Sequence, residues 1–141
     1  MSKYRQLVIE DDPRIADMIC RVAKKANFDV RVTCNSIDMT SLYDAFVPQV
    51  VVLDVFMPNV DGFEVLNFLH THKSSTRIVI ISGRAEYRLM AARMAKGLKL
   101  TIVATLAKPF HIGELRRTLE ATKLLLPAAE HSLPLERQEY A

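Results

Sequence analysis

Three short runs of apolar residues constrain the fold of this chain more than any other feature. They read VVVLDV (50–55), IVIIS (78–82) and TIVATL (101–106). A strand with one face in water alternates polar and apolar residues, whereas an unbroken apolar run predicts a strand covered on both faces. With two less continuous runs, the sequence predicts five strands. They cover residues 6–10, 28–33, 49–54, 77–82 and 101–106.

Segments of helical periodicity separate these strands. Asp12-Pro13 is typical of a helix N-cap followed by proline at the first helical position, and apolar residues recur at helical spacing from Ile15 to Ala26. Gly97 is expected to cap the fourth helix at its C-terminus. The remaining helices are predicted at residues 36–46, 62–72, 84–96 and 111–126.

Five β-α units in succession predict an α/β protein with a parallel sheet and helices on both faces. Right-handed crossovers leave few topologies, and the economical one is a single flavodoxin-like, doubly wound, five-stranded sheet of order 2-1-3-4-5. We expect one domain over residues 1–126. Residues 127–141 are polar, contain two prolines in their first eight residues, and are predicted to be a tail or the start of a linker.

Composition excludes several classes of protein. No run of 18 apolar residues is present, which argues against a membrane span, and the N-terminus becomes acidic too early for a secretory signal. The net charge of +3 is dispersed rather than gathered in a basic stripe, so direct nucleic-acid binding is not expected. Cys20 and Cys34 lack metal-type spacing and are predicted to be reduced, buried residues of a cytoplasmic protein.

The strand ends carry the chemistry. In an open parallel sheet, ligands bind beyond the carboxyl ends of the strands. There the first strand ends on Glu10 and Asp11, the third on Asp54 and the fourth on Ser82, and the fifth runs into Lys108. The crowded carboxylates require a positive partner, and Mg²⁺ is a natural one because it binds one or two carboxylates and keeps several waters. A metal, an amine, a hydroxyl and a carboxylate suit phosphoryl transfer onto that carboxylate.

Each residue also has a purely structural interpretation. Asp11 or Asp12 could cap the first helix, and Asp54 could begin a turn. The same holds for Ser82 as a helix cap and for Lys108 as a surface lysine, while Asp61-Gly62 is a turn signal. The functional interpretation depends on four suitable residue types occurring at the same end of the sheet.

The motifs VIEDDP, LDVFMPNVDG, IISG and LAKPF, in this order, resemble the receiver domain of two-component response regulators (CheY-like). The resemblance covers roughly residues 4–125. It implies that Asp54 is the phospho-acceptor. It also implies that Glu10, Asp11 and Asp54 hold Mg²⁺ together with the backbone carbonyl of Phe56.

The same resemblance implies that Ser82 meets the phosphoryl group and that Lys108 contacts it, with a cis peptide bond before Pro109. Two features depart from the common pattern. Thr105 stands where receivers usually carry the aromatic residue of their switch, and the segment 97–108 is about four residues longer than usual. In that segment the chain resembles receivers attached to EAL-type cyclic-di-GMP phosphodiesterases.

The resemblance implies a signalling domain rather than an enzyme, with slow autodephosphorylation. A histidine kinase or phosphotransfer protein would phosphorylate it, and the face formed by the fourth helix, fifth strand and fifth helix would respond. Three alternatives stay open: a docking receiver that needs no phosphate, an aspartyl-phosphate phosphatase, and a flavin or nucleotide binder. Phe56 replaces the second aspartate of such phosphatases, and the four glycines are too far apart for a phosphate-binding loop.

Overall fold

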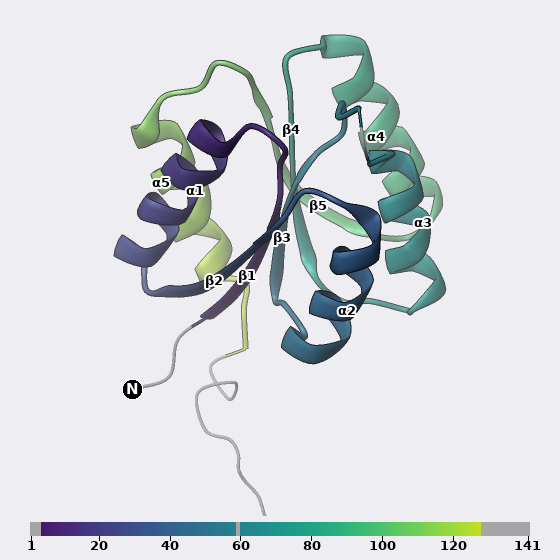
Figure 1. Cartoon of the computed structure of the whole chain (residues 1–141), viewed down its shortest axis with the longest axis horizontal. Helices are drawn as coiled ribbons and strands as arrows, with labels where there is room; N and C mark the ends of the chain where they lie inside the picture. The colour runs from purple at the N-terminus through teal and green to yellow at the C-terminus, as the bar shows by residue number, and fades with distance from the viewer. Residues whose placement is uncertain (1–3, 59, 128–141) are drawn as a thin grey trace, which may run out of the picture.

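Strands and helices alternate throughout the described part of the chain. A computed structural model describes residues 4–58 and 60–127, so most of the expected tail lies outside the described residues. The ten expected elements are all present (Figure 1). In chain order they are β1 (Tyr4–Ile9), α1 (Pro13–Lys25), β2 (Phe28–Thr33), α2 (Ser36–Phe46), β3 (Val50–Asp54), α3 (Gly62–Thr71), β4 (Arg77–Ser82), α4 (Ala85–Gly97), β5 (Thr101–Ala107) and α5 (Ile112–Lys123).

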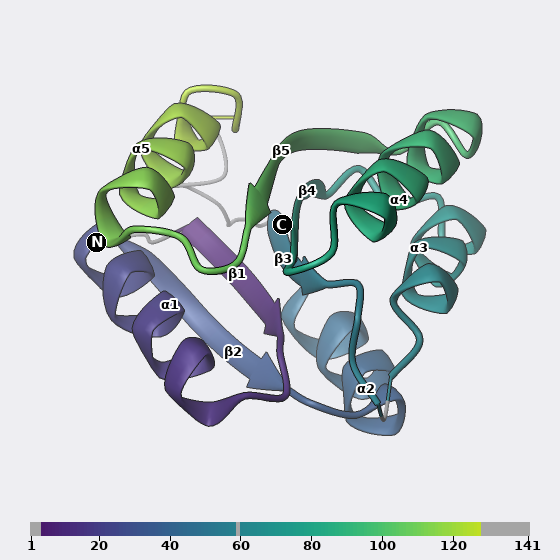
Figure 2. The same ribbon diagram turned by 90° about the horizontal axis from the view of Figure 1, so that it is seen from above.

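The five strands form one parallel sheet of order β2-β1-β3-β4-β5, which confirms the predicted topology. Helices α1 and α5 cover one face, and α2, α3 and α4 cover the other (Figure 2). The strands run upward in Figure 1, so their carboxyl ends meet along the upper edge of the sheet. Residues that follow different strands are therefore brought together there.

The two central apolar runs are buried on both faces, as predicted. Every residue of β3 is buried, and so is every residue of β4 after Arg77. Side chains of these strands alternate between two cores: Val51 and Leu53 pack against α2, α3 and α4, whereas Val50 and Val52 pack against α1 and α5. A strand between two helical layers needs apolar residues at every position.

The prediction of full burial is wrong for the third apolar run. In β5 only Leu106 is buried, because β5 is an edge strand with a single neighbour, β4. Its pairing with β4 shifts by one residue between Ile78 and Val79, so that Ile78 pairs with Ile102 and Val79 with Ala104. This extra residue accommodates part of the additional length noticed in the sequence.

Two smaller predictions are also wrong. Gly97 is the last residue of α4 rather than its cap; Leu98 holds the cap position, and none of the described glycines has positive φ. The cysteines are free but not buried: Cys20 is half-buried and Cys34 is exposed. Cys34 follows the edge strand β2, where no further layer covers it.

Helices α1 and α3 begin with aspartate caps at the carboxyl end of the sheet. The side chain of Asp12 accepts a hydrogen bond from the Arg14 amide at 2.9 Å, and Asp61 accepts one from the Phe63 amide at 2.9 Å. Hydrogen bonding by the Arg14 amide also lowers the pKa of Asp12. Asp12 is therefore the capping residue of α1, which leaves Asp11 available for the site.

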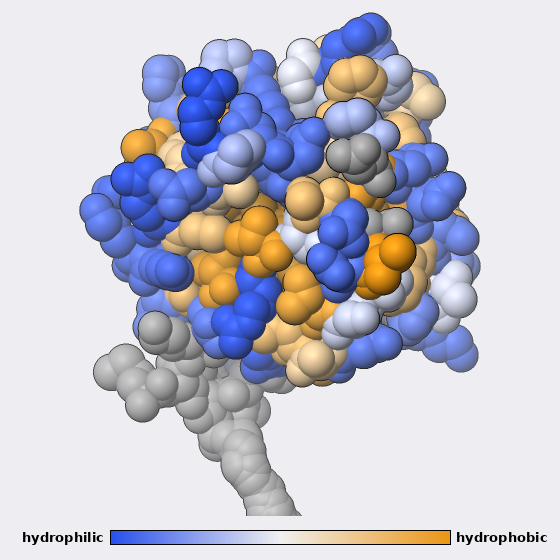
Figure 3. Space-filling view, in the orientation of Figure 1, coloured by the Kyte–Doolittle hydropathy of each residue, from blue (hydrophilic) through white to orange (hydrophobic). Residues whose placement is uncertain are grey.

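The surface is apolar in places. Figure 3 shows apolar side chains gathered over the middle of one face, around β2 and α2, with hydrophilic side chains around the rim. The exposed Val32, Ile37 and Val47 belong to this region of the chain. Within the described residues, no helix is both long and apolar enough to cross a membrane.

Candidate phosphorylation site

Three carboxylates lie together at the carboxyl end of the sheet. Glu10 follows β1 directly and Asp54 ends β3, and these two strands are hydrogen-bonded neighbours. One oxygen from each of Glu10, Asp11 and Asp54 lies within 4.8 Å of the others. Glu10 and Asp54 are each 2% exposed, whereas Asp11 is half-buried at the mouth of the site. Buried like charges at this range require compensation.

Lys108 provides part of that compensation. Its Nζ lies 2.7 Å from Asp54 Oδ2 and 2.7 Å from Glu10 Oε1, so one ammonium pairs with both buried carboxylates. Burial alone would lower the pKa of Lys108, but its hydrogen bonds with Asp54 and Glu10 raise it above the ordinary value. Lys108 therefore stays protonated at neutral pH and neutralises one of the buried charges.

The carboxyl of Glu10 is the most perturbed group of the site. Burial raises its pKa from 4.5 to about 7, with a smaller contribution from the charge of Asp54. The hydrogen bonds to Glu10 from Lys108 and from the Asp12 amide act in the opposite direction but do not cancel the effect of burial. Burial therefore disfavours the ionised form of Glu10 in the metal-free site.

These residues fit a hard divalent cation. The three carboxylate oxygens converge from two adjacent strand ends, and oxygen is the donor that Mg²⁺ prefers. One lysine carries a single positive charge beside three carboxylates, and burial disfavours the ionised form of Glu10 unless a further cation is close. A bound Mg²⁺ would supply the missing positive charge.

Ser82 ends β4 beside this cluster and is fully buried. In the register between β3 and β4, Asp54 pairs with Ile81, which places Ser82 immediately beyond Asp54 along the neighbouring strand. Ser82 Oγ accepts a hydrogen bond from the Arg84 amide at 3.1 Å, and its carbonyl accepts one from the Lys108 amide at 3.0 Å. Ser82 and Lys108 are therefore held together by the backbone.

The loop after β3 is anchored in the core. Val55, Met57 and Val60 are all buried in the core on the α2, α3 and α4 side. The Phe56 amide donates a hydrogen bond to Asp54 Oδ1 at 2.9 Å, while the Phe56 ring is half exposed. At Gly62 a Cβ atom would come within 2.6 Å of the Val55 Cα, so only glycine fits this approach of α3 to β3.

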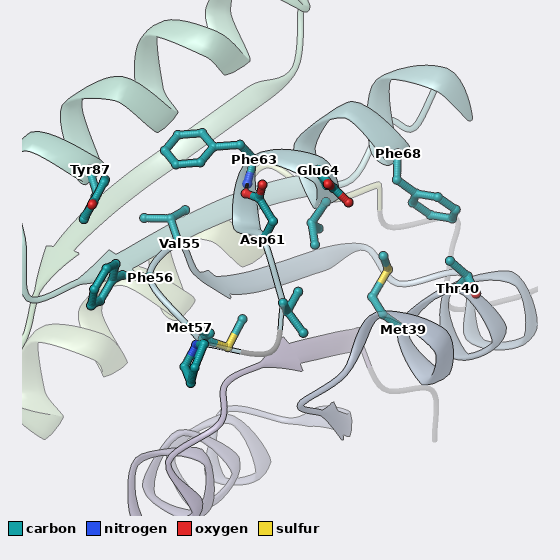
Figure 4. A pocket seen from close by; sticks show the side chains of 13 residues that line it. Met39, Thr40, Val55, Phe56, Met57, Asp61, Phe63, Glu64, Phe68 and Tyr87 are labelled. Atoms are coloured by element: carbon teal, nitrogen blue, oxygen red, sulfur yellow. Dashed lines mark hydrogen bonds between the residues drawn. The ribbon is translucent and has the colours of Figure 1, made fainter.

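Aromatic residues connect this loop to α4. The ring of Phe56 stacks on Tyr87 with 5.0 Å between centroids, and the guanidinium of Arg84 lies over both rings. The same loop borders a groove of about 630 Å³ between α2 and α3 (Figure 4). Asp61 and Glu64 contribute the carboxylates of that groove, which is otherwise lined mainly by apolar and aromatic side chains.

All the predicted site residues lie at this one end of the sheet, and the expected cis peptide bond joins Lys108 to Pro109. The structure gives no ligand role to the Phe56 carbonyl, which stays a prediction. Thr105, at the usual aromatic position, is exposed and pairs with Ile80 in the sheet.

Sequence reasoning missed one contact of the site. No motif of the sequence pointed to Arg88, but its Nη1 donates to the Ser82 carbonyl at 2.7 Å. Its position in the first turns of α4 was the available signal, because a helix that follows β4 begins close to the end of that strand.

The carboxyl end of this doubly wound sheet thus brings together a buried aspartate, an acidic cluster, a hydroxyl and a lysine. The model of the response regulator receiver domain family matches residues 7–120, and the chain belongs to this family. It is similar to the cell cycle response regulator CtrA of Brucella ovis and of Brucella abortus. Each is 35% identical over 120 residues, which cover 83% of this chain and 49% of the relative. The chain thus spans about half the length of these curated relatives.

Solved structures agree with this assignment. A signal receiver domain from Bermanella marisrubri has a TM-score of 0.72 and 27% identity, covering 86% of this chain and 99% of that one. The receiver domain of the Francisella response regulator 1452 has a TM-score of 0.72 and 25% identity, covering 88% and 100%. The chemotaxis regulator CheY4 of Vibrio cholerae, at 20% identity and a TM-score of 0.73, covers 86% and 99% and shares the fold.

Proposed function

We propose that Asp54 accepts a phosphoryl group from the phosphohistidine of a histidine kinase or phosphotransfer protein. The pairing of buried Asp54 with Lys108 beside Glu10 and Asp11 is the observation that supports this role. An oxygen of Asp54 attacks phosphorus and forms a P–O bond, while the P–N bond breaks and its electron pair returns to the imidazole. The products are an acyl phosphate and a histidine side chain.

The residues of the site have separate roles in this transfer. Glu10, Asp11, Asp54 and the carbonyl of Phe56 would hold Mg²⁺, which when bound would neutralise charge on the phosphoryl oxygens. The Nζ of Lys108 already lies 2.7 Å from Asp54 Oδ2 and can pair with a negatively charged phosphoryl oxygen after the transfer. Ser82 donates its hydroxyl to another of these oxygens.

Phosphorylation acts as a switch because it adds roughly two negative charges to a buried site. The responding surface is the one formed by α4, β5 and α5, and its output is a partner or an attached domain. The resemblance in segment 97–108 favours an output of the cyclic-di-GMP phosphodiesterase type. The receiver domain itself works in the cytoplasm as a signalling module rather than as an enzyme with its own substrate turnover.

Mass measurement after incubation with acetyl phosphate and Mg²⁺ tests the proposal. We expect wild type and Asp61→Asn to gain one phosphoryl group and Asp54→Asn to gain none. Asp61→Asn is a matched control because asparagine preserves the helix cap on the same loop. A folded wild type that binds Mg²⁺ but gains no mass would favour the docking receiver, and continuous release of phosphate from a phosphomonoester would favour the phosphatase.

A further inference from the structure

The carbonyl of Ser82 is a junction between the site and α4. It accepts the Lys108 amide at 3.0 Å and the Arg88 Nη1 at 2.7 Å, so both of its lone pairs have donors. One donor belongs to the chain after β5 and the other to the side chain of a helix. Any displacement of the Ser82 backbone must therefore strain or move these two elements.

The contact from Arg88 is stronger than a typical surface contact. A guanidinium donor makes a shorter and stronger hydrogen bond than a neutral donor, and the half-buried position of Arg88 limits competition by water. The backbone of Arg84, the N-cap residue of α4, contributes a second link because its amide donates to Ser82 Oγ at 3.1 Å. The N-terminal end of α4 and its cap thus contact both the hydroxyl and the carbonyl of the same residue.

The aromatic switch residue that commonly links the phosphorylation site of receivers to their surface is replaced by Thr105 in this chain. Thr105 offers a small, exposed side chain where receivers commonly carry an aromatic one. A threonine on the edge strand cannot exchange a ring between a buried and an exposed position. Coupling between the phosphorylation site and a surface requires an element whose arrangement both of them influence. Helix α4 can be that element, because Arg88 joins it to Ser82.

We propose that Arg88 is a positioning residue that couples Ser82 to α4, so that phosphorylation of Asp54 shifts α4 through its guanidinium. This inference rests on the proposed function. When Ser82 turns its hydroxyl toward the phosphoryl group, its carbonyl moves with the end of β4, and Arg88 carries the movement into the helix. Ala91 and Ala95, which α4 buries against the sheet, report the shift.

Amide chemical shifts in the intact chain test the coupling, with Mg²⁺ and beryllofluoride as the phosphoryl mimic. In wild type we expect the amides of Phe56, Ala91 and Ala95 to shift. In Arg88→Met the Phe56 shift persists while the shifts of Ala91 and Ala95 are largely lost. Methionine keeps the helix propensity and most of the stem but cannot donate to the Ser82 carbonyl. Arg88→Lys restores part of the response because an ammonium can donate to the same oxygen.

Arg93→Met is the matched control, since Arg93 is exposed on the same helix. We expect it to respond like wild type. An undiminished response of Ala91 and Ala95 in Arg88→Met, or an equal loss in Arg93→Met, overturns the role of Arg88 while leaving the proposed function intact. An unmoved Phe56 amide in wild type counts against the proposed function itself, and the inference then falls with it.

Discussion

The two ends of the sheet both bury polar residues, but they balance charge in different ways. At the carboxyl end, one lysine pairs with two carboxylates that are almost fully buried, and a third carboxylate lies beside them. At the amino end, a pocket of about 240 Å³ is lined by Arg5 and Arg77 with amide and hydroxyl side chains, and its described lining contains no carboxylate.

Hydrogen bonds at the amino end go to carbonyl and amide oxygens rather than to carboxylates. The side chain of Gln49 accepts a hydrogen bond from the Arg5 amide at 3.0 Å, and the Gln49 carbonyl accepts one from the Arg77 amide at 2.9 Å. The guanidinium of Arg77 donates to the carbonyls of Ser75 and Leu125. These contacts close the lower edge of the fold without a carboxylate in the described lining of the pocket.

The difference separates a structural polar cluster from a functional one. A buried neutral polar group without a partner costs less than a buried charge, and the amino end carries such groups on Gln49 and Thr76. Crowded buried carboxylates reduce stability until a cation binds, so the cluster at the carboxyl end is suited to binding a cation.

The largest difference is expected when the central cation of each end is removed. Lys108→Met leaves Glu10 and Asp54 without their ammonium, and we expect the metal-free protein to lose about 3 kcal/mol of unfolding free energy at pH 8. Arg77→Met leaves no carboxylate unpaired in the described pocket and should cost about 1 kcal/mol. Urea denaturation of both variants measures the difference, and equal losses would contradict it.

Glycine substitutions should give the next largest single loss of stability. Gly62→Ala places a Cβ 2.6 Å from the Val55 Cα, and such overpacking costs about 2 kcal/mol. Gly97, where α4 ends, has no atom within 4 Å of a Cβ and lacks positive φ, so Gly97→Ala should stabilise the helix by about 0.5 kcal/mol. Thermal unfolding of the two variants should show shifts of opposite sign.

The pH dependence of stability should depend on Glu10. Because burial raises its folded pKa from 4.5 to about 7, the folded protein binds this proton more tightly than the unfolded chain does. Protonation of Glu10 therefore contributes fully to folding stability below the unfolded pKa, and this contribution is lost as the pH rises through 7. Without metal, Glu10→Gln should therefore gain about 1–2 kcal/mol over wild type between pH 5 and pH 8.

With Mg²⁺ at pH 8, wild type should be more stable than Glu10→Gln, since the metal binds the ionised carboxylate of Glu10. Unfolding curves of wild type and Glu10→Gln, with and without Mg²⁺, measure both effects. A difference that does not change with pH would show that the burial of Glu10 does not control its protonation.

The smallest contrast concerns two neighbouring aspartates. Asp12→Ala removes the cap of α1 and should cost about 1 kcal/mol while leaving Mg²⁺ affinity unchanged. Asp11→Asn should leave stability almost unchanged but weaken Mg²⁺ binding by more than about tenfold. Calorimetric titration with Mg²⁺ distinguishes them, and similar metal affinities for both variants would contradict the assignment.

Much of this arrangement could be predicted because parallel strands bring their carboxyl ends to one edge. The apolar runs located β3 and β4, their order followed from the β-α alternation, and Glu10, Asp54, Ser82 and Lys108 then had to meet. Local chemistry alone could not decide whether Asp11 or Asp12 caps α1. The hydrogen bond from Arg14 to Asp12 decides it.

Other features depend on tertiary contacts that periodicity does not reveal. The run in β5 contains two threonines but also four apolar residues, and the edge position leaves most of its side chains partly or fully exposed. An arginine on α4 resembles any other surface cation in the sequence. Only the placement of α4 against the end of β4 brings Arg88 to the Ser82 carbonyl.

Reductive trapping of the acyl phosphate tests the central claim most directly. After incubation with acetyl phosphate and Mg²⁺, borohydride converts a phosphorylated aspartate into homoserine, which peptide mass spectrometry locates in the chain. We expect homoserine at position 54 in wild type and none in Asp54→Asn. Homoserine at Asp11, Asp12 or Asp61 instead of position 54 would contradict the assignment of Asp54 as the phospho-acceptor.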